Sequence, residues 1–108
     1  MQIGMKARRD IFQAVADPTR RAILVLLREQ PRTVGAIADR FAVTRQAVSL
    51  HAQVLEECGA ISIEKHGRER LCRLNAATLA EVSEWLRPFA ELWSDRFDQL
   101  DDFLANEE

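Results

Sequence analysis

The chain has 108 residues, of which 47% are hydrophobic and 30% are charged. This is about the size of one domain, which can bury a core without disulfide staples. The composition excludes a disordered or fibrous protein, and no apolar run approaches the roughly 20 residues of a membrane-spanning helix. The first residues do not resemble a secretory signal, and two cysteines are too few for a disulfide scaffold. We therefore expect a cytoplasmic protein with no membrane partner.

Charge is divided unevenly along the chain. The net charge of −2 by itself argues against nucleic acid as a partner. However, residues 1–74 carry 13 Lys and Arg against 8 Asp and Glu, whereas residues 75–108 carry 2 against 9. A chain that is acidic overall can therefore hold a local positive face. Thirteen of the 15 basic residues are arginines, which suit phosphates and guanine edges, although a compositional bias of the genome explains this excess equally well.

Helical periodicity and capping residues predict four helices in the first part of the chain. Their expected bounds are 9–16, 18–29, 33–41 and 45–58. Asp17, Thr33 and Thr44 each precede a helix and can cap its first turn. Gly59 occupies the position where a left-handed helix end is expected. Because the third and fourth helices are short and joined by a tight turn, residues 33–58 are typical of a helix-turn-helix.

Periodicity changes from helical to alternating over residues 60–74. Apolar and polar residues alternate on both sides of a turn at residues 66–69, which predicts a β-hairpin, or wing. Asn75 can cap a last helical segment over residues 76–106. Because of Pro88, we expect this helix either to kink or to end and start again after Leu86. The predicted fold is mainly α with a small β-hairpin, in the order helix, helix, helix-turn-helix, hairpin, long helix, which is a winged helix-turn-helix.

Four stretches of the chain form an ordered set of motifs: Asp17 to Leu24, Thr44 to His51, Val54 to Gly59 and Gly67 to Arg70. Spread over roughly residues 11–104, they resemble the second helix, the recognition helix and the wing tip of the ArsR/SmtB-type bacterial repressors. The segment that begins at Trp85 resembles a subgroup without metal. The resemblance implies one winged helix-turn-helix domain over residues 1–108, acting as a dimeric transcriptional repressor that needs no cofactor.

The fourth helix has one apolar and one polar side. Val48, Ala52 and Leu55 are spaced to face the core, so the opposite side points outward. A helix fits the DNA major groove, where Arg can grip guanine and Gln can grip adenine. Two arginines bracket the hairpin tip and suit phosphates or the minor groove. The residues expected to bind double-stranded DNA are Thr44, Arg45, Gln46, Ser49, Gln53, Arg68 and Arg70.

Some residues near this face are expected to have other roles. In the family, the position of Leu50 is usually polar and that of Ala52 is usually Leu. Leu50 therefore either contacts a thymine methyl group or turns inward. His51 matches a family histidine that packs beneath the helix, which favours a structural role. Arg73 is interpreted as a charge on a strand edge, of the kind that deters aggregation.

The last helix carries more aromatic residues on one stripe than a domain of this size can cover. Left exposed, they would form a large apolar patch, whereas a two-fold dimer through the first and last helices buries it. The resemblance implies the same homodimer. The expected dimer residues are Ile11, Phe12, Val15, Trp85, Phe89, Trp93, Phe97 and Leu100. Such a dimer places its recognition helices roughly 34 Å apart and requires an inverted-repeat operator.

Metal, cofactor and catalytic sites are not expected. Family members that sense metals carry Cys-x-Cys in the third helix, or Asp and His ligands on the last helix. Residues 33–41 lack Cys, and residues 76–108 lack His and Cys. Cys58 and Cys72 are interpreted as small buried hydrophobic residues. Two alternatives stay open: a metal- or thiol-responsive repressor of the same fold, and a winged-helix module that binds protein without reading bases. The sequence does not identify an effector.

Overall fold

The computed structural model describes the backbone of residues 10–106 and the side chains of residues 10–94. Its elements are α1 (Ile11–Ala14), α2 (Pro18–Leu27), β1 (Arg32–Thr33), α3 (Val34–Phe41), α4 (Arg45–Glu57), β2 (Ile61–His66), β3 (Glu69–Leu74), the 3₁₀ helix η1 (Ala76–Leu79) and α5 (Ala80–Asn106). The predicted winged helix-turn-helix order is confirmed. The strand β1 and the helix η1 are additions that the sequence did not predict.

Three helices begin at the residues predicted to cap them. The Asp17 carboxylate accepts hydrogen bonds from the second and third backbone amides that follow it, at 2.8 and 3.0 Å. The hydroxyl groups of Thr33 and Thr44 each accept one from the third amide that follows, at 3.1 and 3.0 Å. Since each such cap is worth about 1 kcal/mol, these contacts fix where α2, α3 and α4 start.

The turn between α3 and α4 depends on one unusual residue. Ala42 adopts a left-handed conformation with a φ of 55°. This lets the backbone amide of Val43 bond to the carbonyl of Ala38 at 3.1 Å, which closes the end of α3. A side chain in this conformation costs roughly 1–2 kcal/mol relative to glycine. The helix-turn-helix is therefore held tightly, with some backbone strain at its corner.

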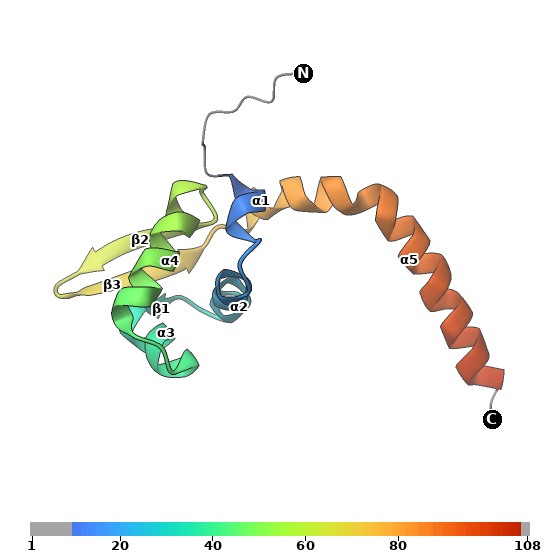
Figure 1. Ribbon diagram of the computed structural model, residues 1–108, viewed down its shortest axis with the longest axis horizontal. Coiled ribbons are helices and arrows are strands. Elements are labelled where there is room, and N and C mark those ends of the chain that lie inside the picture. The colour runs from blue at the N-terminus through green and yellow to red at the C-terminus, as the bar shows by residue number, and fades with distance from the viewer. Residues whose placement is uncertain (1–9, 107–108) are drawn as a thin grey trace, which may run out of the picture.

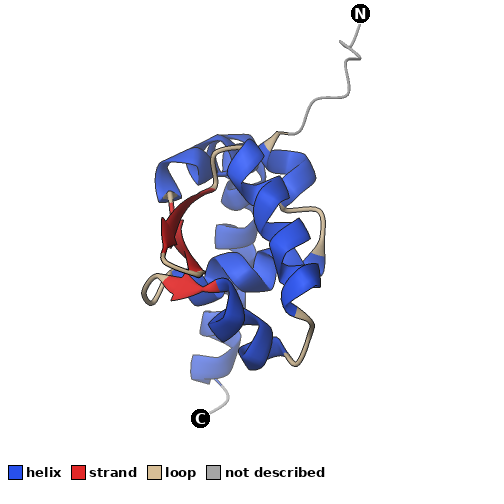
Figure 2. Cartoon of the chain, turned by 90° about the vertical axis from the view of Figure 1, so that its left-hand side faces the viewer, coloured by secondary structure: helices blue, strands red, loops and turns tan. Residues whose placement is uncertain are grey.

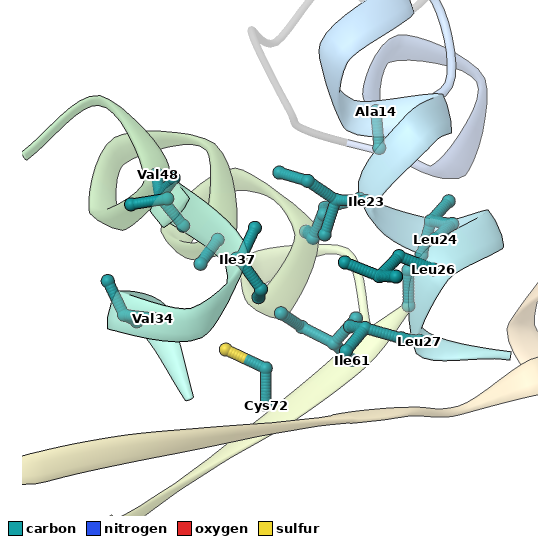
Figure 3. Close-up of a cluster of buried hydrophobic side chains, with 14 of the residues drawn as sticks. Ala14, Ile23, Leu24, Leu26, Leu27, Val34, Ile37, Val48, Ile61 and Cys72 are labelled. Atoms are coloured by element: carbon teal, nitrogen blue, oxygen red, sulfur yellow. The ribbon is translucent and has the colours of Figure 1, made fainter. Parts of the chain in front are cut away.

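The core lies where α2, α3, α4 and β3 meet. Ile23, Ile37, Val48 and Leu55 are fully buried there, together with Cys72 from the sheet. Figure 3 shows side chains from several of these elements pointing toward one another. Because Val48 and Leu55 fill the space behind α4, its opposite face is left outward, as the sequence predicted.

The wing belongs to a three-stranded antiparallel sheet in the order β1-β3-β2. The predicted two-stranded hairpin is thus incomplete, because Arg32 and Thr33 pair with Cys72 and Leu71 of β3. Arg73 lies on β3, the central strand, just beyond the two residues with which β1 pairs, and its side chain is paired with Glu64 of β2. Figure 1 shows the β2–β3 hairpin projecting past α4, and Figure 2 shows the strands gathered on one side of the helices.

The chain after the wing forms η1 and then α5. Asn75 does not cap this segment, because its side chain donates instead to the Gly59 carbonyl at 2.9 Å and to the Thr78 hydroxyl at 3.2 Å. Pro88 lies inside α5, which continues through it without a restart. Proline removes one helical hydrogen bond, and Figure 1 shows α5 changing direction along its length. The helix extends away from the side of the molecule that carries the wing.

Candidate nucleic-acid interface

The outward face of α4 is polar and accessible. Thr44, Arg45, Gln46 and Gln53 are exposed, whereas Ser49 is half-buried. The opposite face is closed, since Val48, Ala52 and Leu55 are buried in the core. The helix thus presents donors and acceptors to solvent on one side and is anchored by packing on the other. A major groove can accommodate a helix presented in this way.

Leu50 lies within this polar face. Its side chain is 62% exposed, so the inward alternative for this residue is wrong. An exposed leucine among polar side chains can contact an apolar group, and the thymine methyl is the apolar group of the major groove. Leu50 therefore belongs to the outward surface of α4.

His51 contacts α2, because its Nδ1 atom lies 3.4 Å from Nη1 of Arg20. The same guanidinium donates to the carbonyl oxygens of Ala14 and Gln13 at 2.8 and 3.0 Å. Arg20 therefore ties the end of α1 to α4, and the structural interpretation of His51 agrees with this contact. Arg20 was not predicted to have a role, although it falls within the motif at the start of α2.

Asp17 lies at the start of the same helix. The hydrogen bond from the backbone amide of Arg20 holds the pKa of the Asp17 carboxyl below its ordinary value of 3.8, and His51 acts in the same direction. The cap is therefore charged at neutral pH, where a carboxylate at a helix start is favoured.

The wing is attached to the recognition helix by a side-chain contact. Nη2 of Arg70 donates to Oγ of Ser49 at 2.5 Å. Arg68 follows Gly67 at the tip, where the backbone has a φ of 63°, and both Arg68 and Arg70 are exposed. Arg70 and Ser49 were each predicted to bind DNA, but their contact with one another was not predicted, because they are 21 positions apart in the sequence.

A cavity of about 150 Å³ lies between the start of α3, α4 and the wing. Its polar lining comes from Thr33, Arg45, Ser49, Arg68, Glu69 and Arg70. Four of the seven residues predicted to bind DNA therefore line one space. Thr44, Gln46 and Gln53 are not part of its lining.

The described part of α5 presents an apolar surface. Trp85 and Trp93 are 58% and 45% exposed, and Phe89 and Leu92 are exposed as well. Phe12 of α1 contacts the Trp85 ring edge-on at 6.1 Å between centroids, so the two predicted dimer segments are neighbours. Ile11 is only 2% exposed and belongs to the core, so it offers no surface to a partner. Phe97 and Leu100 lie outside the residues whose side chains are described.

The cysteines and histidines do not form a cluster in the described residues. Cys72 is buried, and burial raises the pKa of its thiol. Cys58 is half-buried and donates its thiol proton to the Leu55 carbonyl at 3.3 Å between the sulfur and oxygen atoms. Among the residues described, no three His, Cys, Asp or Glu side chains converge as metal ligands. None of the helices described has the length and apolar character needed to cross a membrane.

Together, the fold and this surface define a winged helix-turn-helix of the DNA-binding type. A helix-turn-helix domain family matches residues 15–64. The transcriptional repressor SdpR of Bacillus subtilis is 34% identical over 80 residues, which cover 74% of this chain and 89% of that protein.

Solved structures agree with this similarity. The crystal structure of an ArsR family transcriptional regulator is 40% identical, with a TM-score of 0.67 over 78% of this chain and 87% of that one. The solution structure of a homodimeric winged helix-turn-helix DNA-binding domain from Mycobacterium bovis shares the fold at 22% identity. Its TM-score is 0.62 over 83% of this chain and 91% of that one. The chain belongs to the ArsR/SmtB family of winged helix-turn-helix repressors, which are DNA-binding regulators of transcription.

Proposed function

We propose that this protein is a cytoplasmic, dimeric repressor that binds an inverted-repeat operator through α4 and the wing, and that it has no catalytic activity. The observation that carries the proposal is the polar outward face of α4, anchored from behind by Val48, Ala52 and Leu55. The residues proposed to contact DNA are Thr44, Arg45, Gln46, Ser49, Gln53, Arg68 and Arg70.

Base reading is proposed to rest on the glutamines of α4. Gln46 and Gln53 are exposed and lie outside the cavity that the arginines line. A glutamine amide can pair with adenine through two hydrogen bonds, which is worth roughly 1–3 kcal/mol of discrimination. Leu50 lies on the same exposed surface and can meet a thymine methyl group. An operator rich in A·T pairs at the centre of each half-site fits these side chains.

The dimer is proposed to form through α5 and α1. Trp85, Phe89 and Trp93 leave an apolar surface exposed on α5, and Phe12 extends it onto α1. A surface of this kind favours association with a second copy, because burying it removes apolar area from water. The homodimeric state of the Mycobacterium bovis domain supports this proposal. Two-fold symmetry then matches an inverted repeat in the DNA.

The test is binding of the purified protein to DNA from the promoter next to its own gene. Fluorescence anisotropy over a range of salt concentrations should show tight, sequence-selective binding that weakens steeply with salt, because each phosphate contact releases counterions. Scrambled DNA of the same length is the control. Absent or salt-insensitive binding would overturn the proposal in favour of a module that binds protein.

A further inference from the structure

The cavity between α3, α4 and the wing, the wing cavity, is surrounded by three arginines. Arg45 comes from α4, whereas Arg68 and Arg70 come from the wing. Glu69 is the one carboxylate in the lining, so positive charge exceeds negative charge there. The volume of about 150 Å³ is well above the roughly 10–15 Å³ that a single water needs. The space therefore has the charge and the size for an anionic group larger than water.

Arg45 lies against Gly35 in the wing cavity. A Cβ atom built on Gly35 would lie 2.9 Å from Nη2, 3.0 Å from Cζ and 3.2 Å from Nε of Arg45. The guanidinium group therefore lies close to the backbone at the start of α3, and a side chain at position 35 would push it aside. In this position Arg45 lies between α3 and the wing. The glycine is within a helix and has no left-handed backbone, so the absence of a side chain is the feature that matters here.

The wing arginines are also prepared for an anion. Arg70 is fixed by its hydrogen bond to Ser49, which leaves its other guanidinium nitrogens free to donate. Within the described residues, neither Arg45 nor Arg68 has a carboxylate partner, whereas Arg73 of the same strand as Arg70 is paired with Glu64. Unpaired guanidinium groups that converge on one space bind phosphate through several parallel hydrogen bonds.

We infer that the wing cavity binds one phosphate group of the DNA backbone in each half-site, with Arg45, Arg68 and Arg70 as ligands and Gly35 as the residue that positions Arg45. This inference rests on the proposed function. It assigns Arg45 to the DNA backbone, whose contacts fix the register and orientation of the protein on the duplex. Base reading is left to Gln46 and Gln53. The phosphate joins the recognition helix and the wing to the same point on the duplex.

The first experiment measures operator affinity against salt for the intact dimer. Arg45→Ala should weaken binding to operator and scrambled DNA by the same factor. It should also reduce the slope of log K against log salt by up to about 2 per dimer, since each phosphate contributes about 0.9 and there is one such phosphate in each half-site. Arg73→Gln is the matched control, because Arg73 is a wing arginine already paired with a carboxylate. It should leave the slope unchanged.

The second experiment tests whether Gly35 acts through Arg45. Gly35→Ala should weaken operator binding while keeping or raising the melting temperature, because alanine suits a helix better than glycine does. The same substitution made in the Arg45→Ala protein should have no further effect on binding. Glu69→Gln should change affinity in the opposite direction, strengthening binding by up to about fivefold, because it removes the negative charge from the lining.

The outcomes separate the two proposals. If the wild-type protein does not bind its promoter DNA, the proposed function and the phosphate site both fail. If the wild type binds but Arg45→Ala relaxes base preference with an unchanged salt slope, the phosphate site is wrong and the proposed function stands. If Gly35→Ala lowered operator affinity by the same factor in the wild type and in the Arg45→Ala protein, the positioning role of the glycine would be overturned.

Discussion

The recognition helix α4 and the last helix α5 differ in whether their apolar side is covered. In α4 the apolar side is buried and the exposed side carries Thr44, Gln46 and Gln53. In the described part of α5 the apolar side, which carries Trp85 and Trp93, is exposed as well. Covering a polar face with protein contributes little favourable free energy, whereas covering an apolar face is favourable because it removes apolar surface from water. The two helices therefore predict two different partners, a polyanion for α4 and a second copy of the chain for α5.

The largest expected effect in this comparison comes from the buried side of α4. Leu55→Ala should lower the free energy of unfolding by about 2–5 kcal/mol, because Leu55 is fully buried and the truncation leaves a cavity. Urea denaturation measures the change. Gln53→Ala on the exposed side of the same helix is the control and should stay within about 0.5 kcal/mol. Equal losses for both variants would show that α4 is not anchored as described.

The second effect concerns the apolar side of α5. Trp93→Ala should weaken the dimer by about 1–4 kcal/mol, since exposed tryptophans are frequent centres of protein interfaces. Sedimentation equilibrium measures the dissociation constant. Leu50→Ala provides a matched control, because Leu50 is also an exposed apolar residue but lies on α4. A Trp93 variant that sediments like the wild type would contradict the α5 interface.

A third, smaller effect concerns the cap of α2, which supports α4 from behind through Arg20. Asp17→Ala should cost about 1 kcal/mol at pH 7, because two backbone amides lose their acceptor. The folded pKa of Asp17 is depressed, so its contribution is present above the ordinary value of 3.8 and is lost as the pH falls through the folded pKa.

Thermal denaturation between pH 7 and pH 2 measures this contribution. Asp17→Asn keeps an acceptor at the cap without a titrating group, so it should retain most of the stability at pH 7 and lose less of it in acid. An acid profile of Asp17→Asn identical to that of the wild type would show that this carboxylate contributes nothing to the pH dependence.

The smallest effect lies at the corner of the helix-turn-helix. Ala42→Gly should stabilise the protein by about 0.5–1 kcal/mol, because Ala42 has a φ of 55° and glycine adopts this conformation without a steric cost. The gain is limited by the greater freedom of glycine in the unfolded chain. Calorimetry detects it as a raised Tm. A lowered Tm would mean that the corner carries no strain.

The sequence predicted those parts of the fold that depend on local interactions. Asp17, Thr33 and Thr44 cap helices as their positions indicated, and Gly59 has the expected left-handed backbone, with a φ of 83°. Asn75 was mispredicted because its side chain donates to the distant Gly59 carbonyl and to the Thr78 hydroxyl, and accepts no hydrogen bond from a backbone amide of η1. The local sequence pattern does not distinguish an asparagine that caps its own helix from one that bonds to a distant carbonyl.

The contacts that shape the candidate DNA site are long-range, and the sequence did not predict them. The strand β1 has two residues, too few to show alternation, and it exists because β3 offers pairing partners. The contact of Arg45 with Gly35 and the bond of Arg70 to Ser49 depend on how α3, α4 and the wing pack. The residue types of the site could be predicted from sequence, whereas their grouping around one cavity could not.

The pairing of β1 with β3 has an evolutionary consequence. Thr33 caps α3 and also pairs with Leu71 of the wing, so this short strand joins the start of the helix-turn-helix to the wing. If the proposed binding to an inverted repeat holds, a new distance between half-sites is expected to require changes in α5, whereas a new base sequence is expected to require changes on α4.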